Sequence, residues 1–108
     1  MLAYVFWHVP FARIDTKEYE VALLEFQGHL ARKPPPGLIG CTTYRIPEVP
    51  WLSGHRGYED WYFLESSAAL DILDEEAVGP QRWDIHAGIA AKMDFGHGGL
   101  YEHLHGER

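Results

Sequence analysis

An α+β fold built on one antiparallel sheet is predicted by three features of this 108-residue sequence. Two short segments, 4–9 and 58–65, hold seven of the fifteen aromatic residues and indicate strands, because aromatic and β-branched side chains suit a pleated surface. Apolar residues at helical spacing follow each of these segments. With two further strands the order becomes β-α-β-β-α-β, which right-handed connections fold into a four-stranded sheet with both helices on one face.

The first half of the chain is predicted to contain a strand, a helix and a second strand. The first strand covers residues 2–9. The helix begins beside Asp15, whose carboxylate can accept a hydrogen bond from the Glu18 amide as an N-cap. Its apolar stripe consists of Tyr19, Ala22, Leu23, Phe26 and Leu30. Three prolines and a glycine at 34–37 end the helix, and the second strand follows at 38–46.

Prolines, glycines and periodicity divide the second half of the chain. Two prolines and two glycines mark 47–57 as a loop, longer than most hairpin connections. The third strand covers 58–65, and Ser66 and Ser67 cap a second helix. After Gly79 and Pro80 we expect, in order, a further helical stretch at 81–93, a turn at 95–99 and an edge strand at 100–105.

The first strand is apolar or aromatic on both of its faces. Tyr4, Phe6 and His8 point one way, and residues 5, 7 and 9, which are Val, Trp and Val, point the other. The two helices can cover only one face of the sheet. An uncovered apolar face of this size favours association. The sequence therefore predicts a homodimer in which two sheets pack face to face.

This ferredoxin-like order over the whole chain resembles the dimeric α/β-barrel superfamily, and the segment 64–70 (LESSAAL) resembles the strand-to-helix turn of its antibiotic-biosynthesis-monooxygenase branch. The superfamily also includes haem-degrading monooxygenases, muconolactone isomerases and stress-responsive proteins. The resemblance implies a homodimer that binds a small aromatic or apolar molecule and acts, without a cofactor, as a monooxygenase or isomerase. The loop at 47–57 and the extra helical stretch after Gly79 depart from the usual pattern.

Three residues are candidates for catalysis. His8, in an apolar strand, can act as a general base toward a phenolic substrate, or it can be a core histidine bonded to the backbone. Arg45 can pair with a substrate carboxylate, or with Glu59 in a surface ion pair. Trp61 is predicted to share one face of the sheet with Thr43, Arg45 and Glu59, or it packs in the core or the dimer contact.

Aromatic side chains and one histidine are the candidates for ligand binding. They are Tyr4, Phe6, Trp7, Trp51, Phe63 and His86. Trp51 is a large apolar group on a predicted loop and needs a surface on which to bury. His86 stands on the second helical stretch, where the haem-degrading proteins that the chain resembles carry an axial ligand, so haem is an alternative to a cofactor-free pocket.

Two histidines near the C-terminus suggest a metal. His103 and His105 are two residues apart on the predicted edge strand, so both side chains leave the same face. This spacing can supply two ligands to a divalent metal, with His97, Asp94 or Glu107 as the third. The alternative is a solvated pair at the edge of the sheet.

Composition excludes several classes of partner. Sixteen acidic and nine basic residues give a formal charge of −7, which disfavours binding to nucleic acid. No stretch approaches the roughly 20 apolar residues that span a bilayer, so no membrane association is expected. A single cysteine, Cys41, fits a reducing cytoplasm. A non-enzymatic dimer, whose aromatic sheet face is consumed by packing, remains the alternative to a small-molecule binding protein.

Overall fold

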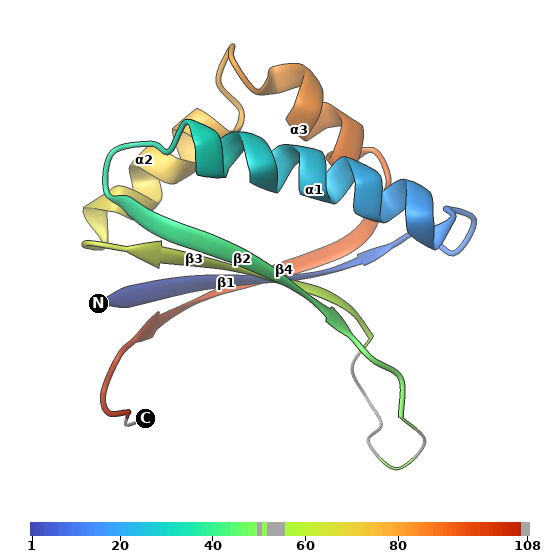
Figure 1. Cartoon of the computed structure of the whole chain (residues 1–108), viewed down its shortest axis with the longest axis horizontal. Helices are drawn as coiled ribbons and strands as arrows, with labels where there is room; N and C mark the ends of the chain where they lie inside the picture. Colours follow the sequence, from blue (N-terminus) through green and yellow to red (C-terminus); the bar gives the residue numbers. More distant parts are fainter. Residues whose placement is uncertain (50, 52–55, 107–108) are drawn as a thin grey trace.

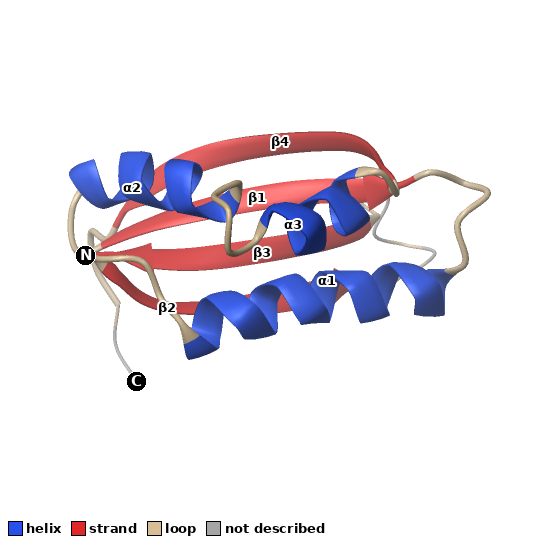
Figure 2. Ribbon diagram, turned by 90° about the horizontal axis from the view of Figure 1, so that it is seen from above, coloured by secondary structure: helices blue, strands red, loops and turns tan. Residues whose placement is uncertain are grey.

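Four antiparallel strands form one sheet in the order β2-β3-β1-β4, and the helices lie together on one of its faces (Figures 1 and 2). This is a computed structural model, and it describes residues 1–49, 51 and 56–106. The elements are β1 (Leu2–Pro10), α1 (Thr16–Arg32), β2 (Leu38–Ile46), β3 (Gly57–Leu64), α2 (Ala68–Ala77), α3 (Trp83–Ala90) and β4 (Met93–Glu102). The predicted ferredoxin-like arrangement is confirmed.

The two aromatic strands, β1 and β3, are the central pair of the sheet. Their antiparallel register sets Tyr4 opposite Tyr62 and His8 opposite Tyr58. Alternation along both strands then assigns these residues, together with Phe6 and Asp60, to the face that the helices cover. The helix-covered face therefore carries aromatic rings together with one carboxylate and one imidazole.

Helix α1 starts and packs as its sequence predicts. The Asp15 carboxylate accepts a hydrogen bond of 3.3 Å from the Glu18 amide. The residues predicted to form the apolar stripe face the sheet, and Tyr19 and Leu30 are completely buried. Gln27, which the stripe does not predict, is also buried. A polar side chain therefore enters the interface between α1 and the sheet.

The predicted fourth strand is corrected by the structure. β4 runs from Met93 to Glu102, whereas residues 95–99 were predicted as a turn. Gly96 and Gly98 lie directly beneath the rings of Phe6 and Tyr4, so that a Cβ atom at either position would collide with the ring. These glycines make room for the aromatic side chains of the neighbouring strand, and they do not turn the chain.

The second helical region is shorter than predicted and is tied to α1 by Arg82. α3 ends at Ala90, and Ser67 makes no side-chain capping bond at the start of α2. Arg82 is buried, with 2% of its surface exposed, and its guanidinium donates to His29 Nδ1 and to the main-chain oxygens of Lys33 and Glu76. It therefore joins the C-terminal ends of α1 and α2 and sets where α3 begins.

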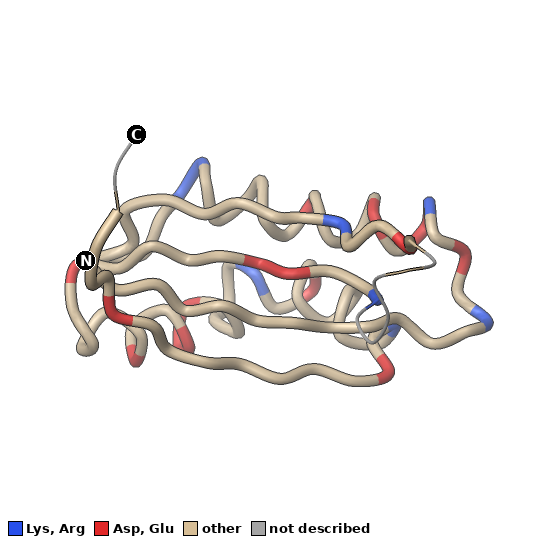
Figure 3. Tube along the Cα trace, turned by 90° about the horizontal axis from the view of Figure 1, so that it is seen from below, with Lys and Arg blue, Asp and Glu red and all other residues tan. Residues whose placement is uncertain are grey.

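No helix covers the opposite face of the sheet (Figure 1), and the strand register places aromatic side chains on it. By strand register the set comprises Trp7, Tyr44, Trp61, Phe63, Phe95 and Tyr101. Tyr44, Phe95 and Tyr101 each expose more than half of their surface. Charged residues are sparse along the strands and include an acidic pair in the middle of β3 (Figure 3). Among the described helices, none is long and apolar enough to cross a membrane.

Candidate functional site

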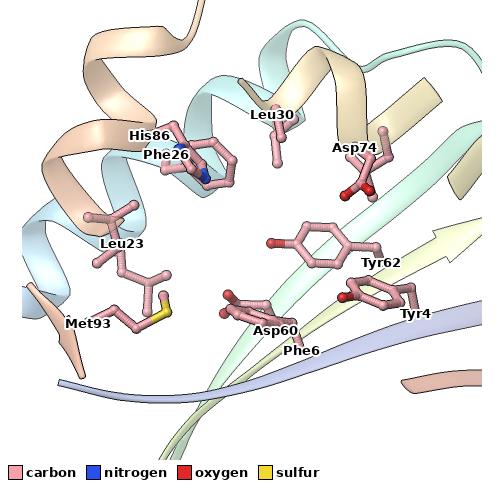
Figure 4. Close-up of a pocket in the computed structure, with 13 residues that line it drawn as sticks. Tyr4, Phe6, Leu23, Phe26, Leu30, Asp60, Tyr62, Asp74, His86 and Met93 are labelled. Atoms are coloured by element: carbon pink, nitrogen blue, oxygen red, sulfur yellow. The ribbon is translucent and has the colours of Figure 1, made fainter. Parts of the chain in front are cut away.

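A cavity of about 160 Å³ lies between the helix-covered face of the sheet and the three helices (Figure 4). It is partly open to solvent. An engineered cavity of roughly this size, about 150 Å³, holds one benzene molecule. Its walls are formed by Tyr4, Phe6, Leu23, Phe26, Leu30, Asp60, Tyr62, Leu73, Asp74, Ala77, His86, Ile89 and Met93. The site therefore has room for about one aromatic ring.

A continuous chain of polar side chains, all buried except the half-buried Thr43, runs beneath this cavity. His8 Nδ1 lies 2.6 Å from the Tyr19 hydroxyl, and His8 Nε2 lies 2.9 Å from Asp60 Oδ2. Asp60 Oδ1 accepts a 2.9 Å hydrogen bond from the Thr43 hydroxyl. Thr43 in turn accepts from the amide of Gln27, also at 2.9 Å. A sixth member, Tyr62, donates its hydroxyl to Gln27 Oε1 at 2.9 Å.

One assignment of hydrogens satisfies every group in this network. Tyr62, Gln27 and Thr43 donate in series toward Asp60, while the Nε2–H of His8 donates to it from the other side. His8 Nδ1 then accepts from the Tyr19 hydroxyl. In this assignment the imidazole is neutral and the carboxylate is the terminal acceptor of both branches. The Asp60 side chain also lines the cavity, so the carboxylate borders both the network and the cavity.

Asp60 is the network member through which His8 reaches the cavity. The His8 side chain is completely buried, does not line the cavity, and has both ring nitrogens bonded within the protein. Its ring stacks on Phe6 and Tyr58 at centroid distances of 5.4 and 5.7 Å. Asp60 is 3% exposed and lines the cavity. His8 therefore acts here by holding Asp60, and the carboxylate is the group that a ligand can meet.

Burial changes the pKa of several groups around the cavity. It raises the pKa of Tyr62 well above the ordinary value, with the Asp60 charge as the next cause. Burial and the Asp74 charge likewise raise the pKa of Tyr4. Desolvation lowers the pKa of His86, so this imidazole is a neutral group near pH 7. The cavity therefore offers hydroxyl groups, a neutral imidazole and carboxylates.

The structure separates the residues that were predicted to share a face with Arg45. The register pairs Thr43 with Asp60 and Arg45 with Tyr58, which puts Thr43 and Arg45 on the helix-covered face. Glu59 and Trp61 lie on the opposite face, and Trp61 Nε1 donates to Glu59 at 3.2 Å. The prediction of one shared face is wrong, because it miscounted the register between β2 and β3.

Arg45 forms a two-pronged ion pair with Glu20 of α1, at 2.6 Å for both bonds, and does not pair with Glu59. The Tyr58 hydroxyl donates to the same carboxylate at 2.7 Å. Hydrogen bonding from Arg45 lowers the pKa of Glu20, while burial and the bond to Glu20 raise the pKa of Tyr58 to about 12. This cluster lies beside a separate hollow of about 230 Å³ and not in the cavity above Asp60.

Half of the predicted ligand-binding residues gather at the cavity. Tyr4, Phe6 and His86 line it, and the His86 ring makes an edge contact with Phe26. Trp7 and Phe63 lie on the opposite face of the sheet together with Trp61. Trp51 is 81% exposed on the connection between β2 and β3. The structure therefore divides the predicted set between two faces and a loop.

The arrangement predicted for a metal site is not observed. β4 ends at Glu102, so His103 and His105 do not stand on one face of a strand. Within the described part of the chain, no group of three His, Cys, Asp or Glu side chains is placed to hold a metal ion. Glu107, one of the third ligands considered, lies outside the described residues.

The cavity beside His86 does not fit haem. Its volume of about 160 Å³ admits about one aromatic ring, whereas a haem has four pyrrole rings in one plane. Asp60 and Asp74 also place two carboxylates against any macrocycle edge at this site. No chemical step is therefore assigned to haem.

Several residues of the site were not identified as functional candidates from the sequence. Gln27 and Tyr19 sit in an amphipathic helix pattern, and Thr43 in a strand, where each is an ordinary residue. Asp60 did carry a signal, because it occupies the same face as Tyr58 and Tyr62 in a strand whose other inward residues are aromatic or apolar. A carboxylate at an inward strand position is expensive to bury and therefore indicates a partner or a function.

Solved structures share this fold along nearly the whole chain. A dimeric ferredoxin-like protein of unknown function from Bacteroides fragilis is 10% identical, with 94% of this chain and 95% of that chain covered and a TM-score of 0.70. A putative antibiotic biosynthesis monooxygenase from Nitrosomonas europaea is 12% identical, with coverages of 97% and 100% and a TM-score of 0.70. SnoaB, a cofactor-independent oxygenase from Streptomyces nogalater, is 14% identical, with coverages of 97% and 92% and a TM-score of 0.65.

These comparisons confirm the ferredoxin-like fold that the resemblance implied. No family model matches the sequence, and no curated protein sequence matches it. At 10–14% identity the shared architecture does not carry residue roles from one protein to another. The function must therefore be argued from the cavity and its side chains.

Proposed function

We propose that the cavity between sheet and helices binds a small ligand built on one ring, and that Asp60 takes a proton from it. The observation that supports this proposal is the meeting of a solvent-accessible aromatic cavity with a carboxylate oriented by two fixed donors, His8 and Thr43. Proton abstraction beside a carbonyl or from a phenol leaves an electron-rich anion. Return of the proton to another atom of the ligand completes an isomerisation that uses only side chains of this chain and requires no cofactor.

The surroundings of Asp60 suit this role. Aromatic and aliphatic walls exclude water from a bound ring, which strengthens electrostatic interactions inside the site. The raised pKa values of Tyr4 and Tyr62 keep their hydroxyls protonated, so the Tyr4 hydroxyl can donate toward a developing oxyanion. The Tyr62 hydroxyl is already bonded to Gln27 and therefore holds the network in place.

Solvent proton exchange tests the proposal. Single-ring ketones with exchangeable C–H groups are incubated with the protein in D₂O, and loss of the proton signal is followed by NMR. We expect the protein to accelerate the exchange of at least one such compound. Asp60→Asn should lower the rate by about 10²- to 10⁴-fold, as expected for a lost general base. Ala77→Phe, which fills the cavity from α2, should abolish acceleration, whereas retained exchange in Asp60→Asn contradicts the role of the carboxylate.

Oxygen uptake distinguishes isomerisation from oxidation at the same site. Because two structural relatives are described as a monooxygenase and a cofactor-independent oxygenase, the anion formed at Asp60 has molecular oxygen as a second reaction partner. An oxygen electrode reading in the presence of each exchanging compound separates the two outcomes. If the protein consumes oxygen and Asp60→Asn does not, the reaction is an oxidation. If protons exchange but no oxygen is consumed, the reaction is an isomerisation.

We propose further that the uncovered aromatic face of the sheet packs against the same face of a second copy. Six aromatic side chains on that face and the description of several structural relatives as dimeric support this arrangement. Light scattering after gel filtration should give twice the 12.4 kDa of the chain. Trp61→Glu should shift the protein to the monomer, because it places a charge at the centre of the apolar face. A monomeric native protein would contradict the homodimer.

A further inference from the structure

We infer that the ligand of the cavity carries a positively charged amine, held at the rim by Asp74 while its ring lies against the aromatic walls. This inference rests on the proposed function, because it names the class of ligand that the same cavity takes. Four side chains with π faces, Tyr4, Phe6, Phe26 and Tyr62, line the space. A cation close to such ring faces is attracted by their quadrupoles.

Two carboxylates give the cavity its charge. Asp60 lies on the sheet and is bonded within the network, whereas Asp74 lines the cavity from α2 and is exposed to solvent (Figure 4). The Asp74 charge is close enough to Tyr4 to raise the pKa of its hydroxyl. A ligand ammonium beside Asp74 therefore leaves the ring of the ligand above Asp60, where the proton is taken.

Helix α2 carries the carboxylate that lines the cavity beside Tyr4. Its C-terminal half supplies Leu73, Asp74 and Ala77 to the cavity. The helix ends at Ala77, and its last turn contains no basic residue. The carbonyl of Glu76 at this helix end already accepts a hydrogen bond from the Arg82 guanidinium, so the helix end does not add to the attraction for a ligand cation. The Asp74 side chain is therefore the group that attracts the ammonium.

No described residue that lines the cavity is lysine or arginine. Arg45 is engaged with Glu20 outside the cavity, and Arg82 with His29, Glu76 and the end of α1. His86 is the remaining basic group at the wall, and its neutral form dominates near pH 7 because desolvation lowers its pKa. An anionic ligand would meet two carboxylates without a compensating cation, so the cavity selects against it.

Three ligands of matched size test the inference: benzylamine, benzyl alcohol and benzoate, which are cationic, neutral and anionic at pH 7. Isothermal titration calorimetry should give benzylamine a dissociation constant at least about tenfold lower than that of benzyl alcohol, with benzoate the weakest. Asp74→Asn should remove most of this preference and leave the benzyl alcohol constant within about twofold. Ala77→Phe should abolish binding of all three, which locates them in this cavity.

The outcomes separate this inference from the function on which it rests. If benzyl alcohol binds as tightly as benzylamine and Ala77→Phe blocks both, the cavity binds a ring without selecting a cation, and the inference is overturned while the proposed function stands. If the preference for benzylamine survives Asp74→Asn, the assignment of the rim carboxylate is wrong. If none of the three ligands binds, the inference is overturned, and the exchange of single-ring ketones in D₂O decides the proposed function separately.

Discussion

Replacement of Gln27 by leucine tests whether the six polar side chains beneath the cavity act as one network. Gln27 is 6% exposed and is bonded at both ends, to Thr43 and to Tyr62, at 2.9 Å each. Leucine is close to glutamine in size, so that Gln27→Leu removes two hydrogen bonds and leaves the buried Tyr62 hydroxyl without its acceptor. The lost bond to Thr43 contributes about 1 kcal/mol and the stranded Tyr62 hydroxyl costs about 1–3 kcal/mol, so we expect a loss of about 2–4 kcal/mol.

A double-mutant cycle makes this expectation specific. Tyr62→Phe alone removes one bond and strands Gln27 Oε1, which we expect to cost about 1–2 kcal/mol. The double variant, Gln27→Leu with Tyr62→Phe, leaves no unpaired group from that bond, because both the donor and the acceptor are removed. Its total loss should therefore fall short of the sum of the single losses by about 1–2 kcal/mol.

Urea denaturation followed by circular dichroism supplies the free energies, provided that the slope of the free energy with urea is the same in all four proteins. Proton-exchange rates of the ketones, measured on the same Gln27 and Tyr62 variants with Asp60 intact, report whether the network also orients the carboxylate, because a disturbed Gln27 leaves Thr43 free to turn away from Asp60. Additive losses, within about 0.5 kcal/mol, would refute the account of a coupled network.

Three further predictions address the walls, the pH dependence and the ion pair outside the cavity. Gly98→Ala should weaken benzyl alcohol binding at least about tenfold in calorimetry, because the new Cβ atom pushes the Tyr4 ring into the cavity. Adding Tyr4→Leu to this variant should restore binding. Desolvation lowers the pKa of His86 in the folded protein from its ordinary 6.5, so the unfolded chain binds the proton more readily. The urea concentration at the unfolding midpoint should therefore fall as the pH drops through about 6.5. His86→Gln should reduce this fall but not remove it, because the pKa of His29 is also lowered in the folded protein. Arg45→Gln should leave ligand affinity within about twofold, since its partner Glu20 lies outside the cavity, and a larger loss would place Arg45 in the site.

Most of the fold follows from local sequence, and the errors have physical causes. Helix α1 and the two aromatic strands were predicted correctly because residue propensity, the spacing of apolar residues and the flanking prolines and glycines all indicate the same element. The prediction of a turn at residues 95–99, inside β4, failed because a glycine can indicate two different structural requirements. It marks turns through its backbone freedom, and it also marks places where another side chain needs the space of a Cβ. Only the register between β1 and β4 shows that Gly96 and Gly98 belong to the second kind.

The site was predictable only in part, because it depends on register between strands that are far apart in sequence. Tyr4 and Phe6 were identified from one strand, and His86 from its place on a helix. The pairing of Thr43 with Asp60 requires the relative positions of β2 and β3 to within one residue, since a slip of one residue reverses the face. Arg45 and Trp61 were assigned to one face by such a slip.

Two features of this protein are costly for stability and occur at the same place. A carboxylate that is 3% exposed must be desolvated, and an apolar side chain of similar size at position 60 would avoid this loss. A cavity beside it forfeits packing that larger side chains at positions such as Ala77 would supply. Either feature alone has a structural explanation, since a polar network can fix the register of a sheet and small voids occur in many cores. Their coincidence, with the carboxylate directed at the cavity, is the arrangement that ligand chemistry requires and that stability alone does not.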